Sequence, residues 1–194
     1  MKGTIVLTDL RAHARDHVAL AERLANEHLA TIEEIAERIR GSLAAGGRLL
    51  VCGNGGSAAD AQHFAAELLG RARRERASLP AIALTTDTSA LTGIGNDYAF
   101  EDIFSRQVAA HAGDHDVVVG ISTSGASENV ARALRTARER GASAIALTGG
   151  DGGRVADAAD IALVIPSRVT ARIQEMHILA IHLICERIDD WAVS

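Results

Sequence analysis

The chain has 194 residues, of which 47% are hydrophobic and 3% aromatic, and its formal net charge is −5. This length and apolar content suffice for one domain with a sizeable core, built mainly from Ala, Val, Leu and Ile. The acidic balance argues against a nucleic-acid face or a membrane-surface patch, so we expect neither nucleic acid nor a membrane as a partner.

Residues 11–40 are predicted to form a long helix, because they are rich in Ala, Leu and Glu and contain neither Pro nor Gly. Ile32, Ile35 and Ile39 recur at helical spacing, which gives this stretch an apolar face. We treat residues 1–45 as a helical N-terminal region that serves oligomer packing, and residues 46–194 as an α/β core with a C-terminal helix.

Five short apolar runs follow, at residues 48–52, 81–84, 117–121, 144–147 and 161–165. Each is continuous rather than alternating, as expected of strands buried on both faces of a parallel sheet. Helical patterns are predicted at residues 57–69, 101–110, 127–140 and 154–159, with a last helix from 170 to about 191. This alternation predicts an α/β fold, a three-layer α/β/α sandwich around a five-stranded parallel sheet, in a single domain spanning 1–194. The first and last helices are longer than one sheet needs for cover, so we expect a homo-oligomer.

Cellular location follows from what the sequence lacks. Cys52 and Cys185 lie in apolar context and are expected to be buried thiols in a reducing compartment. The N-terminus has no apolar stretch typical of a signal peptide, and no segment has the apolar run of a membrane span. We therefore expect a cytoplasmic protein. Lys2 is the only lysine, which disfavours Schiff-base chemistry on a carbonyl substrate.

A local basic run follows the helix predicted at 57–69, and it consists of Arg71, Arg73, Arg74 and Arg76. A charge run of this kind usually forms a solvated face. We interpret it as a solvated loop and not as a binding patch.

A glycine-rich loop, Gly53-Asn54-Gly55-Gly56-Ser57, connects the first predicted strand to a helix. The glycines let backbone N–H groups approach a ligand, and Ser57 can cap the helix. The G-x-G-x-x-G spacing is absent and no acidic residue closes the following strand, so we expect no nucleotide cofactor. Taken alone, the loop is equally consistent with a tight strand-to-helix turn.

A second loop carries four hydroxyl side chains, those of Ser122, Thr123, Ser124 and Ser127. It lies between a strand and a helix N-terminus, whose free N–H groups and positive dipole end attract anions. In open parallel sheets, ligands bind at the carboxyl ends of the strands. A helix cap would account for Ser127 alone, so the clustering predicts a cradle for a phosphate monoester.

Acid–base and metal-ligating residues occur on two predicted helices. His63 and Glu67 share one helix face at i, i+4, a spacing that suits two metal ligands, an acid–base pair or a surface ion pair. Gln174 and His182 are separated by about 12 Å along the last helix, at about 1.5 Å per residue. We therefore favour contributions from that helix to two sites at a subunit interface. His177 lies at a different angle and is interpreted as a packing or surface residue.

The chain resembles the phosphoheptose isomerase family of the sugar isomerase (SIS) domain superfamily, which has a Rossmann-like fold. The matching segments are, in order, CGNGGSAADAQHFAAEL, GNDYAFEDIFSRQV, GISTSGASENV, LTGGDGG and RIQEMHILAIH. The resemblance covers residues from about 46 to 189. It implies an enzyme that converts sedoheptulose 7-phosphate to D-glycero-D-manno-heptose 7-phosphate through a cis-enediol, as a homotetramer with one zinc ion per subunit.

The resemblance also assigns roles. Glu67 is the base and His182 its acid partner. The zinc ligands are His63, Glu67, Gln174 and His182. Phosphate is bound by Ser122, Thr123, Ser124 and Ser127, and the other substrate-binding residues are Asn54, Gly55, Gly56, Ser57, Asn96, Asp97 and Gln174.

Three alternatives share this fold. The nearest is a non-enzymatic SIS protein that associates with the bacterial replication initiator, to which RIQEMH and SLPAIALTTDTSALTGI are also similar. Glu67 and His182, which that group lacks, favour the enzyme. A sugar-phosphate-sensing regulator needs a DNA-binding domain, and the residues before Gly46 are too few and too acidic for one. An aminosugar isomerase is expected to use a C-terminal lysine, which this chain lacks.

Overall fold

Five parallel strands form one sheet in the computed structural model, which describes residues 9–193. The strands are β1 (Leu49–Gly53), β2 (Ala81–Ala83), β3 (Val117–Ser122), β4 (Ser143–Gly149) and β5 (Ile161–Ile165), in the order β2-β1-β3-β4-β5. β3 is central, and β1 lies between β2 and β3, with Leu49 paired to Ala81 on one side and to Val117 on the other. All pairings are parallel, so the carboxyl ends of the strands share one edge of the sheet.

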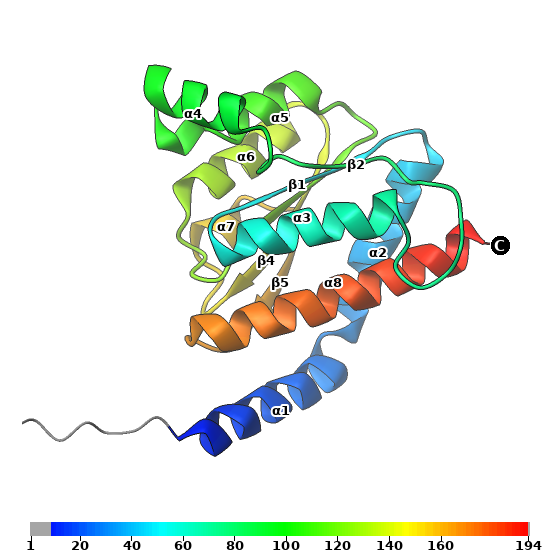
Figure 1. The fold of residues 1–194 in the computed structure, drawn as a ribbon, viewed down its shortest axis with the longest axis vertical. Helices are drawn as coiled ribbons and strands as arrows, with labels where there is room; N and C mark the ends of the chain where they lie inside the picture. The colour runs from blue at the N-terminus through cyan, green and yellow to red at the C-terminus, as the bar shows by residue number, and fades with distance from the viewer. Residues whose placement is uncertain (1–8, 194) are drawn as a thin grey trace, which may run out of the picture.

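Helices cover both faces of this sheet (Figure 1). One layer holds α1 (Leu10–Glu27), α2 (Leu29–Ala44), α3 (Gly56–Leu69) and α8 (Thr170–Ala192). The other holds α4 (Thr88–Asp97), a 3-10 turn (Phe100–Asp102), α5 (Ser105–His111), α6 (Glu128–Glu139) and α7 (Gly153–Asp157). Alternate residues of β1 enter the two cores, with Leu49 and Val51 on one side and Leu50 and Cys52 on the other. The predicted α/β/α sandwich is confirmed.

The N-terminal helical stretch is two helices, so the prediction of one long helix was wrong. The break falls at His28, whose backbone (φ −123°, ψ −1°) leaves helical geometry while its N–H still donates to Leu24 O. α2 packs onto the sheet and buries Ile32, Ile35 and Ile39, whereas α1 buries only Leu24. α1 instead runs beside α8, where His17 Nδ1 donates to Glu175 Oε2 at 2.8 Å. Tertiary packing, not helix propensity, sets this break.

The sequence prediction also missed α4 and merged the 3-10 turn with α5. α4 contains Gly93 and Gly95 and buries none of its residues fully, and only Leu91 and Ile94 pack against the core, so its apolar pattern is too short to detect. One feature of the sequence could have indicated the start of α4, because Asp is a preferred N-cap residue. In the structure the Asp87 carboxylate accepts a hydrogen bond from Ala90 N at 2.9 Å. The remaining predicted elements are confirmed, and both cysteines are buried. Within residues 9–193, every helix is too short or too polar to span a bilayer.

Candidate active site

The hydroxyl-rich loop lies where β3 ends and α6 begins. Ser127 occupies the N-cap position of α6, but its Oγ contacts Ser122 Oγ at 2.9 Å and does not cap the helix. Ser124 Oγ accepts from Ala126 N at 3.2 Å, which leaves its hydroxyl hydrogen available to a ligand. Thr123 and Ser124 line a cavity of about 240 Å³ that also includes Thr170 at the start of α8. This cavity offers an anion neutral donors, the N-terminus of α8 and Arg168, and Asp151 also lines it.

A second turn braces the hydroxyl-rich loop. Gly125 has φ +66°, and a Cβ at this position would lie 2.3 Å from Gly152 O, so only glycine fits. Val155 N donates to Gly125 O at 3.0 Å, and Thr148 Oγ1 donates to Gly152 O at 3.2 Å. The end of β4 and the turn that follows it, which together form the LTGGDGG segment, therefore hold the hydroxyl-rich loop in place.

The glycine-rich loop approaches the same edge of the sheet from β1. Asn54 and Asn129 exchange two side-chain hydrogen bonds of 2.9 Å, which join this loop to α6. A Cβ on Gly56 would lie 2.1 Å from Gln174 Nε2, so glycine permits α8 to approach closely. Ser57 is buried inside α3 and the N-cap position is Gly55, with no side-chain cap, so the prediction that Ser57 caps the helix was wrong.

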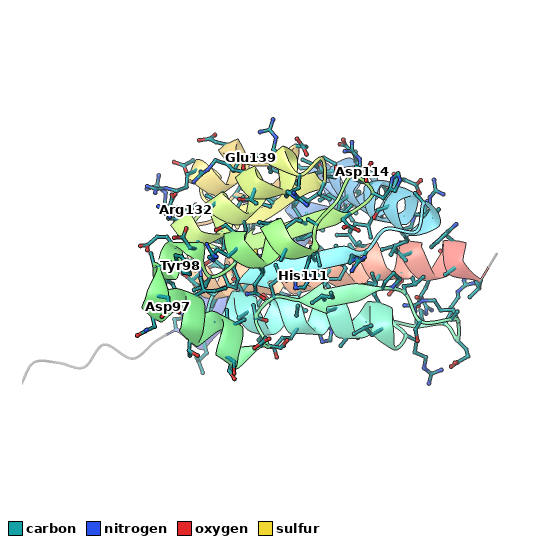
Figure 2. All side chains as sticks on the ribbon, turned by 90° about the horizontal axis from the view of Figure 1, so that it is seen from above. Asp97, Tyr98, His111, Asp114, Arg132 and Glu139 are labelled. Carbon is teal, nitrogen blue, oxygen red and sulfur yellow. The ribbon has the colours of Figure 1, made fainter. Side chains whose placement is uncertain are left out.

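Asn96 and Asp97 lie apart from these loops, at the exposed end of α4. Asn96 Nδ2 donates to Asp97 Oδ1 at 2.9 Å. Figure 2 shows Asp97 and the adjacent Tyr98 at one end of the molecule, away from Asp114. A cavity of about 440 Å³ separates α4 from the glycine-rich loop, and its lining does not include either residue.

Three of the predicted acid–base and metal residues meet between α3 and α8, which run side by side (Figure 1). His63 Nε2 lies 2.9 Å from His182 Nε2 and 3.5 Å from Glu67 Oε1. Glu67 and His182 face a cavity of about 220 Å³ that is also lined by Ala72, Arg73 and Glu186. A carboxylate and an imidazole on one cavity can take and return a proton.

Gln174, the fourth predicted zinc ligand, does not join this cluster. Its amide lies against Gly56, two turns of α8 before His182. The two imidazole nitrogens and the Glu67 carboxylate form the kind of donor set that zinc accepts. Across residues 9–193, however, three or more His, Cys, Asp or Glu side chains are nowhere arranged to hold a metal ion.

Two polar residues near the site were not assigned a role from the sequence. Asp60 lies on the face of α3 that carries His63 and is buried, which raises the pKa of its carboxyl although the Gln174 amide and His63 oppose the rise. The i, i+3 spacing of Asp60 and His63 could have indicated from the sequence that the two side chains share one face of a helix. His177 is a buried packing residue whose Nε2 donates to Thr148 O at 3.1 Å, and burial lowers the pKa of its ring to about 4.

Known proteins match the chain over most of its length. The SIS domain family model matches residues 12–149. A phosphoheptose isomerase of Geobacter sulfurreducens is 55% identical over 95% of this chain and 97% of its own length. The structure of phosphoheptose isomerase GmhA from Neisseria gonorrhoeae aligns with a TM-score of 0.88 and 48% identity, covering 93% of this chain and 97% of that one. A phosphoheptose isomerase from Francisella tularensis aligns with a TM-score of 0.90 and 40% identity, covering 95% of this chain and 100% of that one. The chain belongs to the phosphoheptose isomerase family of SIS-domain proteins.

Proposed function

We propose that this protein converts sedoheptulose 7-phosphate to D-glycero-D-manno-heptose 7-phosphate. The observation that carries the proposal is the meeting of Glu67 and His182 on one cavity, in a chain 55% identical to a phosphoheptose isomerase. A non-enzymatic protein that associates with the replication initiator has no need of this acid–base pair. The same pair therefore favours the isomerase over that alternative.

The chemistry is a proton transfer between adjacent carbons. The carbonyl at C2 of the ketose acidifies the proton on C1, which Glu67 removes to give a cis-enediol. His182 moves a proton between O1 and O2, and return of a proton to C2 yields the aldose. General acid–base action of this kind supplies about 10²–10⁴-fold acceleration.

The two loops hold the substrate. The phosphate monoester is bound by Ser122, Thr123, Ser124 and Ser127. The proposed sugar-binding residues are Asn54, Gly55, Gly56 and Ser57 at the glycine-rich loop, Gln174 on α8, and Asn96 and Asp97 on α4, which lie apart from both loops in one copy of the chain. The free hydroxyl hydrogen of Ser124 and the start of α8 on the same cavity support the phosphate assignment.

A zinc ion is proposed at His63, Glu67, Gln174 and His182. When bound, it would act as a Lewis acid on the sugar oxygens. The convergence of His63, Glu67 and His182 supports this assignment. Zinc content of the purified protein tests it, and a His63→Ala variant should lose the metal.

A second copy of the chain is proposed to complete the site, in a homotetramer. Gln174 and His182 are about 12 Å apart along α8, at about 1.5 Å per residue, too far to reach one ion from one helix. A solution mass of four times 20.3 kDa would support the tetramer, and a monomer would contradict it. We also propose a cytoplasmic location, which cell fractionation tests.

Turnover tests the function directly. Purified protein, with and without added zinc, is incubated with sedoheptulose 7-phosphate and separately with fructose 6-phosphate. We expect an aldose heptose phosphate from the first substrate and much slower reaction of the second. Absence of reaction with sedoheptulose 7-phosphate under both conditions would contradict the proposal.

A further inference from the structure

The loop between α3 and β2 carries the arginine run, and its last member is not solvated. Arg76 and Asp189 form an ion pair with 2.7 Å between Nε and Oδ1, and each side chain is only 1% exposed. The prediction of a solvated loop was therefore wrong for Arg76. The pair joins this loop to the C-terminal half of α8.

Arg76 also binds the end of α3. Its Nη2 donates to Glu67 O at 2.8 Å, and its Nη1 donates to Leu68 O at 2.8 Å and to Gly70 O at 3.2 Å. The last carbonyls of a helix have no partner within the helix, so one guanidinium here satisfies several of them. The same side chain thus holds the backbone of the proposed base and the helix that carries its proposed acid partner.

Asp189 holds the other part of the loop. Its Oδ2 accepts from Arg73 N at 2.7 Å and from Arg74 N at 2.9 Å. These bonds and Arg76 keep the pKa of the Asp189 carboxyl below its usual range, although burial acts in the opposite direction. Asp189 follows His182 by seven residues, which is about two turns of helix, so both lie on the same face of α8.

The loop forms one wall of the acid–base cavity. Ala72 and Arg73 line that cavity together with Glu67, His182 and Glu186. Because Asp189 binds the backbone at Arg73, displacement of the ion pair would move this wall as well as the end of α3.

A buried ion pair generally stabilises a protein no more than an apolar pair of similar volume, so stability alone does not account for one here. We propose that Arg76 and Asp189 are positioning residues of the isomerase. They hold α3 and the loop against α8 so that Glu67 and His182 face one cavity. This inference rests on the proposed function, because its effect is measured as a loss of isomerase turnover.

The test removes both charges at once, so that neither is left buried alone. In the Arg76→Met/Asp189→Leu double variant we expect kcat to fall tenfold or more, while KM changes less than threefold because the phosphate loop lies elsewhere. The thermal midpoint should fall, because the carbonyls that Arg76 binds and the amides of Arg73 and Arg74 lose a partner, so kcat is compared well below the midpoint of the variant. The control is Arg74→Gln, which breaks the exposed Arg74–Asp190 pair on the same loop and should leave kcat unchanged. Wild-type kcat in the double variant would overturn the proposal.

One further variant keeps the test decisive. Should the double variant not fold, Arg76→Lys retains the charge but not the planar fork that reaches several carbonyls, and we expect its kcat to fall with little change in KM. Wild-type kcat in this variant would also overturn the proposal.

Hydrogen exchange separates this proposal from the proposed function. The amides of Arg73 and Arg74 should exchange at least tenfold faster in Asp189→Asn than in Asp190→Asn. Equal exchange rates in the two variants would overturn the proposed role of Asp189, even if the enzyme is active. Faster exchange in Asp189→Asn than in Asp190→Asn, together with a wild type that does not turn over sedoheptulose 7-phosphate, would instead locate the failure in the proposed function.

Discussion

The Nε2 atoms of His63 and His182 lie 2.9 Å apart, with the two rings edge to face at 69°. A hydrogen bond at this distance needs a hydrogen on one nitrogen and a lone pair on the other, so at least one ring is neutral. Protonation of both rings would bring like charges together. Glu67 Oε1 lies 3.5 Å from the same His63 Nε2, so the three side chains meet at one point.

The acid partner can be tested at His182. His182→Gln keeps a polar side chain but cannot carry a proton between sugar oxygens. We expect kcat to fall by about 10²- to 10⁴-fold with a much smaller change in KM. Steady-state kinetics measures both, and His111→Gln, an exposed histidine on α5, is the matched control. An unchanged kcat in His182→Gln would remove the residue from the mechanism.

The phosphate cradle can be tested at Ser124. Its hydroxyl hydrogen is available to an oxyanion, and a hydrogen bond to a charged group contributes about 1.5–3 kcal/mol. Ser124→Ala should therefore raise KM by roughly tenfold or more while kcat changes little. Ser143→Ala, at the opposite end of the sheet, should leave both constants unchanged. A fall in kcat alone would argue for a role other than phosphate binding.

The support behind that cradle can be tested at Gly125. A Cβ there would meet Gly152 O at 2.3 Å in a backbone with φ +66°. Gly125→Ala should lower the free energy of unfolding by about 1–3 kcal/mol and weaken binding of inorganic phosphate. Gly93→Ala, in α4 with open space around the added methyl group, should be neutral or stabilising by up to about 1 kcal/mol. Chemical denaturation compares the two, and equal stability in both would contradict the close contact.

Stability should depend on pH through His177. Burial lowers the pKa of this ring to about 4, whereas the unfolded chain takes a proton near pH 6.5. The unfolded state therefore binds more protons between these values, and the free energy of unfolding falls as pH drops from about 6.5 to about 4. At about 1.36 kcal/mol per pKa unit, this residue accounts for about 3 kcal/mol.

The matched variant is His177→Gln, whose amide can still donate to Thr148 O. We expect the loss of stability between pH 6.5 and 4.5 to be smaller in the variant than in wild type, with equal slopes above pH 7. Urea unfolding at several pH values measures this difference. Identical pH dependence in the two proteins would show that His177 is not a buried neutral ring.

Strongly periodic elements were predictable because burial imposes their pattern. The continuous apolar runs at β1 and β3 and the long apolar face of α8 lie close to their predicted positions. The break at His28 and the helix α4 were not predictable in this way, since one depends on packing against α8 and the other buries none of its residues fully. Short-range patterns miss contacts that exist only after folding.

The same distinction applies to the site. The i, i+4 spacing placed His63 and Glu67 on one face, and helix length alone separated Gln174 from His182. Nothing local in the sequence distinguishes Arg76, buried against Asp189, from its neighbour Arg74, whose side chain is 56% exposed. That difference arises from α8, which is more than one hundred residues away in the chain.

The most direct test of the account is proton transfer by Glu67. Wild type and Glu67→Gln are incubated with sedoheptulose 7-phosphate in deuterated water, and the sugar is followed by proton NMR. We predict a heptose 7-phosphate carrying deuterium at C2 in the wild type, and product formation at least 10²-fold slower in Glu67→Gln. Product formed at the same rate by both proteins would contradict the assignment of Glu67 as the base.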